Sequence, residues 1–262
     1  MTIKIETGSL NTSLPTVLYE NIFTVFNITA TSEATNGLAI NCVGDQTFDF
    51  WTGTAVTDRI SLDATTPTEV DCLGISNHDL FTQGADIVLE SSTDDISWTS
   101  RGSLTPVDDS DIFLIIPTVT ARYWRVSVTN GPASLGVVKL GKRLVFTAGL
   151  LHGYTPTNFS DDIKVIDGVT IGGNFTGSTI VSLGGKASFA LGGMTRDFIE
   201  GEMLPFINHF NRSKSFFWAG GPDYLSLDTA YCWRPRNGST LKPKYVGGNI
   251  VEVTRINVRV LK

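Results

Sequence analysis

The stretch Tyr123-Trp124-Arg125-Val126-Ser127-Val128 decides the fold class of the first half of this chain. Every second residue from Trp124 is large and apolar, a period of two that is typical of a β-strand with one face in a core. The same alternation recurs at Ile60-Ser61-Leu62 and at Asp86-Ile87-Val88-Leu89-Glu90, and turn-forming clusters such as Asn130-Gly131-Pro132 separate the segments. Short strands between turns, without a long helical period, predict an antiparallel β-sandwich.

The composition is that of an ordinary globular protein. The chain has 262 residues, of which 41% are hydrophobic and 18% charged. This length predicts two domains, although one large all-β unit would also fit it. The net charge of −6 argues against nonspecific nucleic-acid binding, which relies on a basic surface.

The sequence predicts no membrane span and no signal peptide. The first ten residues lack an apolar core, and no run of eighteen apolar residues occurs. The cysteines, Cys42, Cys72 and Cys232, are too few and too scattered for a disulfide framework or a CxxC metal knuckle. We therefore expect synthesis in a reducing compartment.

A domain boundary is predicted between residues 148 and 149. The strand pattern ends near Arg143, and the segment from Gly149 to Pro156 has turn-forming residues at both ends. Residues 1–149 contain 8 basic and 17 acidic residues, whereas residues 150–262 contain 12 and 9. The net charges are thus −9 and +3, so the two halves differ in sign.

The second half predicts an α+β domain with an antiparallel sheet and one main helix. The helix runs from Thr195, a suitable N-cap, to about Phe210, and Pro205 is expected to kink or restart it. Strands are expected on both sides of this helix, at residues 163–166, 179–183, 187–191, 215–218, 230–233 and 254–260.

No segment specifies a catalytic, cofactor or metal site. Gly136 to Arg143 has phosphate-loop spacing, but Arg143 stands where the motif needs a hydroxyl. The paired aspartates, such as Asp94 and Asp95, lack calcium-loop spacing, and the three histidines lie far apart without a catalytic motif. We therefore expect a protein that is not an enzyme and needs no cofactor.

Two kinds of residue are candidates for binding by the first domain. The rings of Trp51, Trp98 and Trp124 suit either sugar stacking or core packing, and the core is the simpler interpretation because they lie in strand-like contexts. His78 and Phe81 lie in a polar segment that predicts a loop tip, where binding specificity often resides. They are the expected loop contacts.

Three stretches of the first domain resemble the discoidin family, also called the coagulation-factor C-type or galactose-binding-like family. They are residues 29–34 with Asp45-Gln46-Thr47 and Trp51 downstream, residues 88–98, which end in Trp98, and the strand Ala121-Arg122-Tyr123-Trp124-Arg125-Val126. The resemblance covers roughly 120 residues and implies a jelly-roll β-sandwich. It transfers no ligand residues, because the binding loops of this family vary.

The second half resembles distal-tail-like structural proteins from the tail tip or baseplate of long-tailed bacteriophages. The order of its motifs carries the resemblance: Gly153-Tyr154-Thr155-Pro156, a sheet, a helix with proline, then Phe216-Phe217-Trp218 and Tyr231-Cys232-Trp233. The resemblance implies a virion component, made in the bacterial host cytoplasm, that forms a ring at the end of the tail tube. A hexamer is one ring order that it allows.

Two functions follow as expectations. The first is a non-enzymatic tail-tip subunit that binds copies of itself and other tail-tip, tail-tube or baseplate proteins, with the sandwich as an accessory or adhesion domain that contacts a host surface glycan. The alternative is a carbohydrate-binding cell-surface or secreted protein. Neither requires nucleic acid as a partner.

Arg255 and Arg259 are the expected assembly contacts. From Arg212 to Lys262 there are nine basic and three acidic residues, and the alternation of Thr254–Val260 places both arginines on the face opposite Ile256 and Val258. An ordinary solvated face is the other interpretation of these charges. A ring needs a contact between two different patches, which complementary charge would orient.

Overall fold

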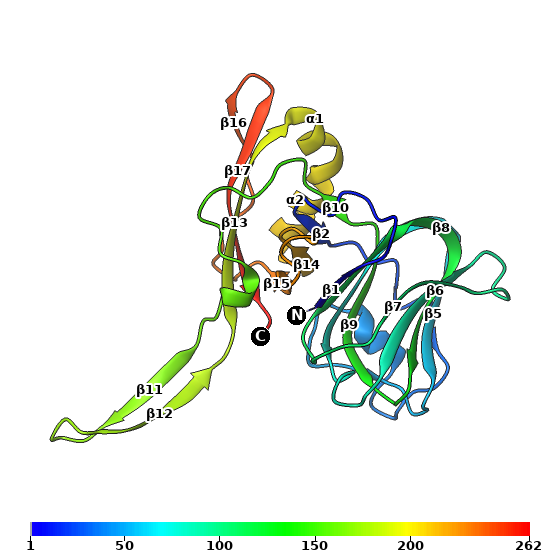
Figure 1. Ribbon diagram of the computed structural model, residues 1–262. Coiled ribbons are helices and arrows are strands. Elements are labelled where there is room, and N and C mark those ends of the chain that lie inside the picture. The colour runs from blue at the N-terminus through cyan, green and yellow to red at the C-terminus, as the bar shows by residue number, and fades with distance from the viewer. Residues whose placement is uncertain (1) are drawn as a thin grey trace.

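The alternating segments of the first half form β-strands that pair mostly antiparallel, as predicted. The computed structural model describes residues 2–262, and its strands run in the order β4-β9-β5-β8-β6-β7, with β1 parallel to β8 and β3 beside β5 (Figure 1). The elements are β1 (Thr2–Ile5), β3 (Ile28–Ala30), the 3₁₀ turn η1 (Ala39–Val43), β4 (Trp51–Thr52), β5 (Asp58–His78), β6 (Asp86–Ser92), β7 (Thr99–Leu104), β8 (Ile112–Thr129) and β9 (Ser134–Gly141).

The apolar residues that alternate along these strands are buried in the core of the β-sandwich. Trp124, Val126 and Leu62 are buried in one apolar cluster together with Trp51. The indole N–H of Trp51 donates to the carbonyl of Ser32 at 3.0 Å, and that of Trp124 to the carbonyl of Ala121 at 3.1 Å. Because both rings are buried and hydrogen-bonded, they pack in the core and present no face to a sugar.

The second sheet contains strands from both ends of the chain. Its order is β10-β2-β14-β15-β17-β13, and β16 pairs with β17. Residues 16–18 and 144–145 thus lie in the sheet of the second half, an arrangement across the expected boundary that the sequence did not predict. The strands are β2 (Thr16–Leu18), β10 (Leu144–Val145), β13 (Gly185–Thr195), β14 (Phe216–Ala219), β15 (Thr229–Trp233), β16 (Lys244–Gly247) and β17 (Ile250–Val260).

The predicted helix covers one face of this sheet. It comprises α1 (Arg196–Phe198), the π-turn η3 (Ile199–Met203) and α2 (Leu204–Asn211), and the Thr195 hydroxyl caps it by accepting from Phe198 N at 3.3 Å. Pro205 lies at the start of α2, where its missing N–H is tolerated after the π-turn. The helix runs on from α1 through η3 into α2, with Pro205 at the start of α2, and the mainly β fold class with its α+β second part is as predicted.

A third apolar cluster joins the sandwich to the second sheet. Cys72, Phe113 and Val137 from the sandwich pack against Phe217 and Tyr231 from β14 and β15. A methyl group on Gly74 would lie 2.5 Å from the Phe217 ring, so only glycine allows this approach. The two parts are therefore packed against each other, and β2, which follows the sandwich strand β1 in the chain, lies in the second sheet.

The remaining strands form a separate ribbon. β11 (Lys164–Val169) and β12 (Phe175–Ser182) pair with each other alone among the described residues, and the 3₁₀ turn η2 (Thr157–Phe159) precedes them. Figure 1 shows this hairpin projecting away from the rest of the protein. We call residues 163–183 the arm.

Candidate assembly surface

The arm exposes an unusual amount of apolar side chain. Both its faces are open to solvent, and Ile171 at its tip and Phe175 beside it are among the most exposed residues, Phe175 at 68%. The exposed apolar residues of the arm are Ile163, Val165, Ile166, Val169, Ile171, Phe175, Ile180, Val181 and Leu183. Contiguous apolar surface of this kind marks interaction sites in soluble proteins.

A hairpin without a third strand or a covering layer is also weak by itself. An isolated two-stranded ribbon is at best marginally stable in water, because it buries too little apolar surface to offset its ordering. The described residues provide no sheet partner for the outer edge of β11 or of β12. The arm thus exposes apolar side chains and two strand edges that have no pairing strand among the described residues.

Ion pairs fix the root of the arm to the end of the second sheet. Asp162 lies 2.7 Å from Nη1 of Arg259 and 2.8 Å from Nζ of Lys186, and Asp161 lies 3.0 Å from Nζ of Lys262. The hydrogen bonds from Lys186 and Arg259 hold the pKa of the Asp162 carboxyl below its usual value. Arg259 therefore already has a partner within the chain, where it positions the segment that enters β11.

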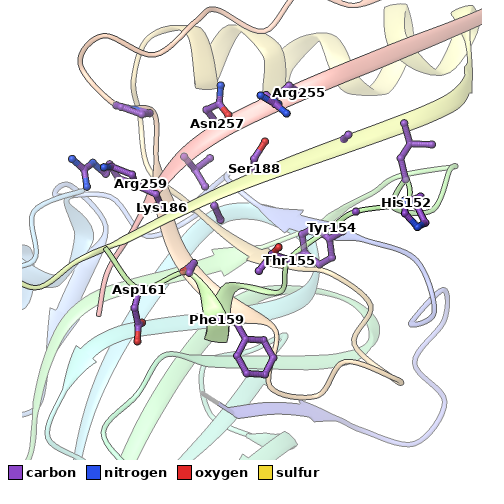
Figure 2. A pocket seen from close by; sticks show the side chains of 17 residues that line it. His152, Tyr154, Thr155, Phe159, Asp161, Lys186, Ser188, Arg255, Asn257 and Arg259 are labelled. Atoms are coloured by element: carbon purple, nitrogen blue, oxygen red, sulfur yellow. The ribbon is translucent and has the colours of Figure 1, made fainter. Parts of the chain in front are cut away.

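Arg255 is placed differently. Its side chain is exposed on β17, and no ion pair joins it to another residue in the described part of the chain. A groove of about 590 Å³ lies beside it, between the outer face of β13 and β17 and the segment of residues 151–161 (Figure 2). Ser188 and Asn257, paired across the two strands, provide further polar groups in this groove.

The strand that carries both arginines confirms the alternation expected from the sequence. Ile256, Val258 and Val260 are buried, whereas Arg255 and Asn257 are exposed. The side chain of Thr254, expected on the buried face, lies outside the described residues. The assembly role of Arg255 and Arg259 stays a prediction.

Tyr154, which is partly buried, lines the groove and packs against the core of the second sheet. The Tyr154 hydroxyl donates to Oδ2 of Asp228 at 2.6 Å and accepts from Nε1 of Trp218 at 2.9 Å. Burial, followed by the nearby Asp228 charge, raises the pKa of Tyr154 well above its usual range. A side chain on Gly220 would collide with the Asp228 carboxylate, which explains the glycine after the aromatic strand β14.

The two expected loop contacts occupy different environments. His78 is the last residue of β5 and is only 6% exposed, with Nε2 at 2.8 Å from the carbonyl oxygen of Ser110. Burial lowers the pKa of its imidazole. His78 is thus not a loop-tip side chain as expected, because the strand continues further than its polar neighbours suggested. Phe81 follows in a turn and is 53% exposed, and its binding role stays a prediction.

The polar groups that the sequence did not reveal lie at the junction between the two parts. Asp45 pairs with Nζ of Lys139 at 3.0 Å and accepts a hydrogen bond from the Ser215 hydroxyl. The Tyr231 hydroxyl donates to the backbone carbonyl of Asp45 at 2.9 Å and also contacts Ser215. Asp45 and Ser215 are 170 positions apart, and neither lies in a motif that would predict their contact from the sequence.

Metal-binding clusters and membrane-spanning helices are both absent from the described residues. Among residues 2–262, no group of three or more histidine, cysteine, aspartate or glutamate side chains is arranged to hold a metal ion. No helix in the same range is long and apolar enough to cross a membrane.

Comparison with known proteins gives structural likeness alone. No family model matches the chain, and no curated protein matches it. Similar solved structures include a CBM32 module, CpGH89CBM32-5 from Clostridium perfringens in complex with GalNAc-β-1,3-galactose, at 18% identity and a TM-score of 0.40 over 44% of this chain and 94% of that one. Chitosan-binding module 1 of a chitosanase/glucanase from Paenibacillus sp. IK-5 is 17% identical, with a TM-score of 0.42 over 47% and 100% of the two chains. The CBM32 of AlyQ in complex with 4,5-unsaturated mannuronic acid is 18% identical, with a TM-score of 0.40 over 47% and 95%.

Proposed function

We propose that this protein is a non-enzymatic structural subunit of a bacteriophage or phage-derived tail tip, which assembles into a ring with copies of itself. The exposed apolar arm is the observation that carries the self-assembly part of the proposal. The phage assignment rests on the motif order of the second half, from Tyr154 to Trp233. The β-sandwich serves as the accessory or adhesion domain of the particle.

The shape of the molecule supports this role. A projecting ribbon lets one subunit reach past its own surface to a neighbour, and burial of its side chains there contributes roughly 25 cal/mol for each Å² of apolar surface. The root is held by three ion pairs to β13 and the C-terminal residues, so the arm leaves the sheet at a defined place. Defined exit geometry favours one repeated contact over random aggregation.

Sedimentation of the purified protein tests the proposal. Wild type is compared with a variant in which residues 164–182 are replaced by a short Gly-Ser linker between Ile163 and Leu183. We expect concentration-dependent oligomers for wild type and monomers for the armless variant. Circular dichroism should show the same folded body in both, because β11 and β12 pair with no other strand of the described chain. Monomeric wild type at every concentration would refute self-assembly.

Carbohydrate binding by the sandwich is the second candidate. Phe26 and Phe48 are 96% and 74% exposed in loops, and exposed aromatic rings on loops are common in binding sites. GalNAc-β-1,3-galactose, chitosan oligosaccharides and an unsaturated mannuronic acid are suitable probes, since the similar sandwich modules are named with these ligands. Calorimetric titration should detect binding to wild type and its loss in Phe26→Ser with Phe48→Ser. Absence of binding across a wider glycan array would remove this candidate.

A further inference from the structure

The long ribbon of β13 and β17 ends in two different exposed features. The arm enters β13 at Gly185, which pairs with Val260. β16 pairs with β17 at the other end, where Ile250 lies opposite Thr195. Eleven residues of β13 separate the two ends, about 35 Å at the rise of an extended strand. Figure 1 shows the arm and β16 at opposite ends of this ribbon.

β16 is an open edge strand with apolar side chains. All four of its residues are exposed, with Tyr245 at 60% and Val246 at 54%, and it pairs with β17 alone in the described part of the chain. Its outer edge therefore presents backbone N–H and C=O groups to solvent. Such an edge is a template for a strand from another chain.

Of the two arm strands, β12 is better suited than β11 to pair with the edge of another chain. Proteins commonly protect edge strands with charged residues. β11 contains Lys164 and Asp167, whereas the eight residues of β12, from Phe175 to Ser182, contain no charge. β12 thus has an uncharged edge on which Phe175, Ile180 and Val181 are exposed, and such an edge is an aggregation hazard unless a partner covers it.

Charge also favours pairing between the arm and β16. Asp167 lies in the part of the arm away from its root, and Lys244 is the single charged residue of β16. Both are exposed, and no ion pair occupies either within residues 2–262. Addition of β12 to β16 places β11, in which Asp167 lies opposite Ser178 of β12, one strand away from Lys244, so the arm and its acceptor strand carry charges of opposite sign.

We propose that β12 of one copy adds to the outer edge of β16 in the next copy. The contact covers both exposed ends of the β13–β17 ribbon at once. Because these ends are different surfaces, the contact is head to tail and repeats from copy to copy until a ring closes or a filament grows. Backbone hydrogen bonds provide affinity, and the alternate side chains of the arm provide specificity. This inference rests on the proposed self-assembly and names its partner surface.

Mixing two defective variants tests the contact. The armless variant keeps the β16 edge, and Tyr245→Asp with Val246→Asp keeps the arm but places two acids on the edge. Each variant alone should sediment as a monomer, and an equimolar mixture should give a species of twice the mass of one chain and nothing larger. Val56→Asp with Val107→Asp is the matched control: these two apolar residues of the sandwich are 64% and 70% exposed, and the variant should assemble as wild type does.

Other outcomes would overturn the inference. Wild-type-sized oligomers of the edge variant would place the acceptor elsewhere and leave self-assembly intact, and dimers of the edge variant alone would indicate pairing of two arms. Monomeric wild type that floats with anionic phospholipid vesicles would make the arm a membrane contact and refute both proposals. Should the two aspartates disturb folding, Tyr245→Ser with Val246→Ser removes the apolar area without adding charge, and the same mixture is repeated.

Discussion

The Asp111 carboxylate accepts the backbone N–H of Tyr231 at 2.7 Å, a hydrogen bond that joins the start of β8 in the sandwich to β15 in the second sheet. The Ser76 hydroxyl donates to the other oxygen of the same carboxyl group. Asp111 thus links the two parts by a buried hydrogen bond next to the apolar cluster of the junction, and its burial affects stability.

The contribution of Asp111 to stability should depend on pH. Burial raises the pKa of this carboxyl to about 6 against hydrogen bonds that lower it, whereas the unfolded chain keeps about 3.8. As the pH rises, the carboxyl therefore loses its proton in the unfolded state before it does so in the folded state. The free energy of unfolding falls by about 3 kcal/mol between pH 4 and pH 6 for this reason. Urea unfolding gives the free energy of unfolding of wild type and of Asp111→Asn from pH 4 to 7. The difference between the two proteins should change by this amount across that range. Asp167→Asn on the arm is the control, and a constant difference would contradict the assignment.

Removal of Asp45 should weaken the same junction. Lys139 is 3% exposed, so Asp45→Ala leaves its ammonium group buried without a partner. Because Asp45 itself is partly open to water, we expect a loss of about 2 kcal/mol in the free energy of unfolding, below the range for a fully buried pair. Asp45→Ala combined with Lys139→Met should recover part of that loss in urea unfolding. An equal loss in the single and the double variant would show that the pair is not the cause.

Gly74→Ala should destabilise the packing of the two parts. Its new methyl group would lie 2.5 Å from the Phe217 ring, so β5 and β14 must move apart, at a cost of about 1–3 kcal/mol. Phe217→Leu in the same chain should relieve the overlap and restore part of the lost thermal stability. Gly149→Ala is the matched control, because nothing lies within 4 Å of the position that its methyl group would take. Equal melting temperatures for the two alanine variants would refute the steric argument.

Arg255 and Arg259 should affect assembly for different reasons. Arg255→Glu changes an exposed charge beside the groove, and we expect it to weaken assembly at 0.1 M salt more than at 1 M, since the screening length falls from ~10 Å to ~3 Å. Arg259→Glu removes the ion pair with Asp162 at the root of the arm, and its effect should persist at high salt. Sedimentation at both salt concentrations separates the two. Assembly unchanged in both variants would leave Arg255 as solvated surface and would limit Arg259 to its ion pair with Asp162.

The sequence by itself determined the local elements. Alternation in residues 123–128 predicted part of β8, and the apolar stripe after Thr195 predicted the helix that ends at Asn211. These patterns are local, because a strand or helix with one buried face must repeat its apolar residues at a fixed period. The sequence also predicted the buried and exposed faces of β17 from Arg255 to Val260.

Only the tertiary structure decided how these elements meet. β2 joins the second sheet through Leu18 and Phe217, a pairing across almost 200 residues, and no local pattern records a partner at that distance. His78 was expected at a surface, yet the sheet around it makes it buried. The arm is the opposite case: its strands carry apolar side chains such as Val165, Phe175 and Ile180, but no other layer of the described chain covers them. Whether an apolar strand is buried depends on which surfaces the folded chain brings to it, and that is a property of the whole fold.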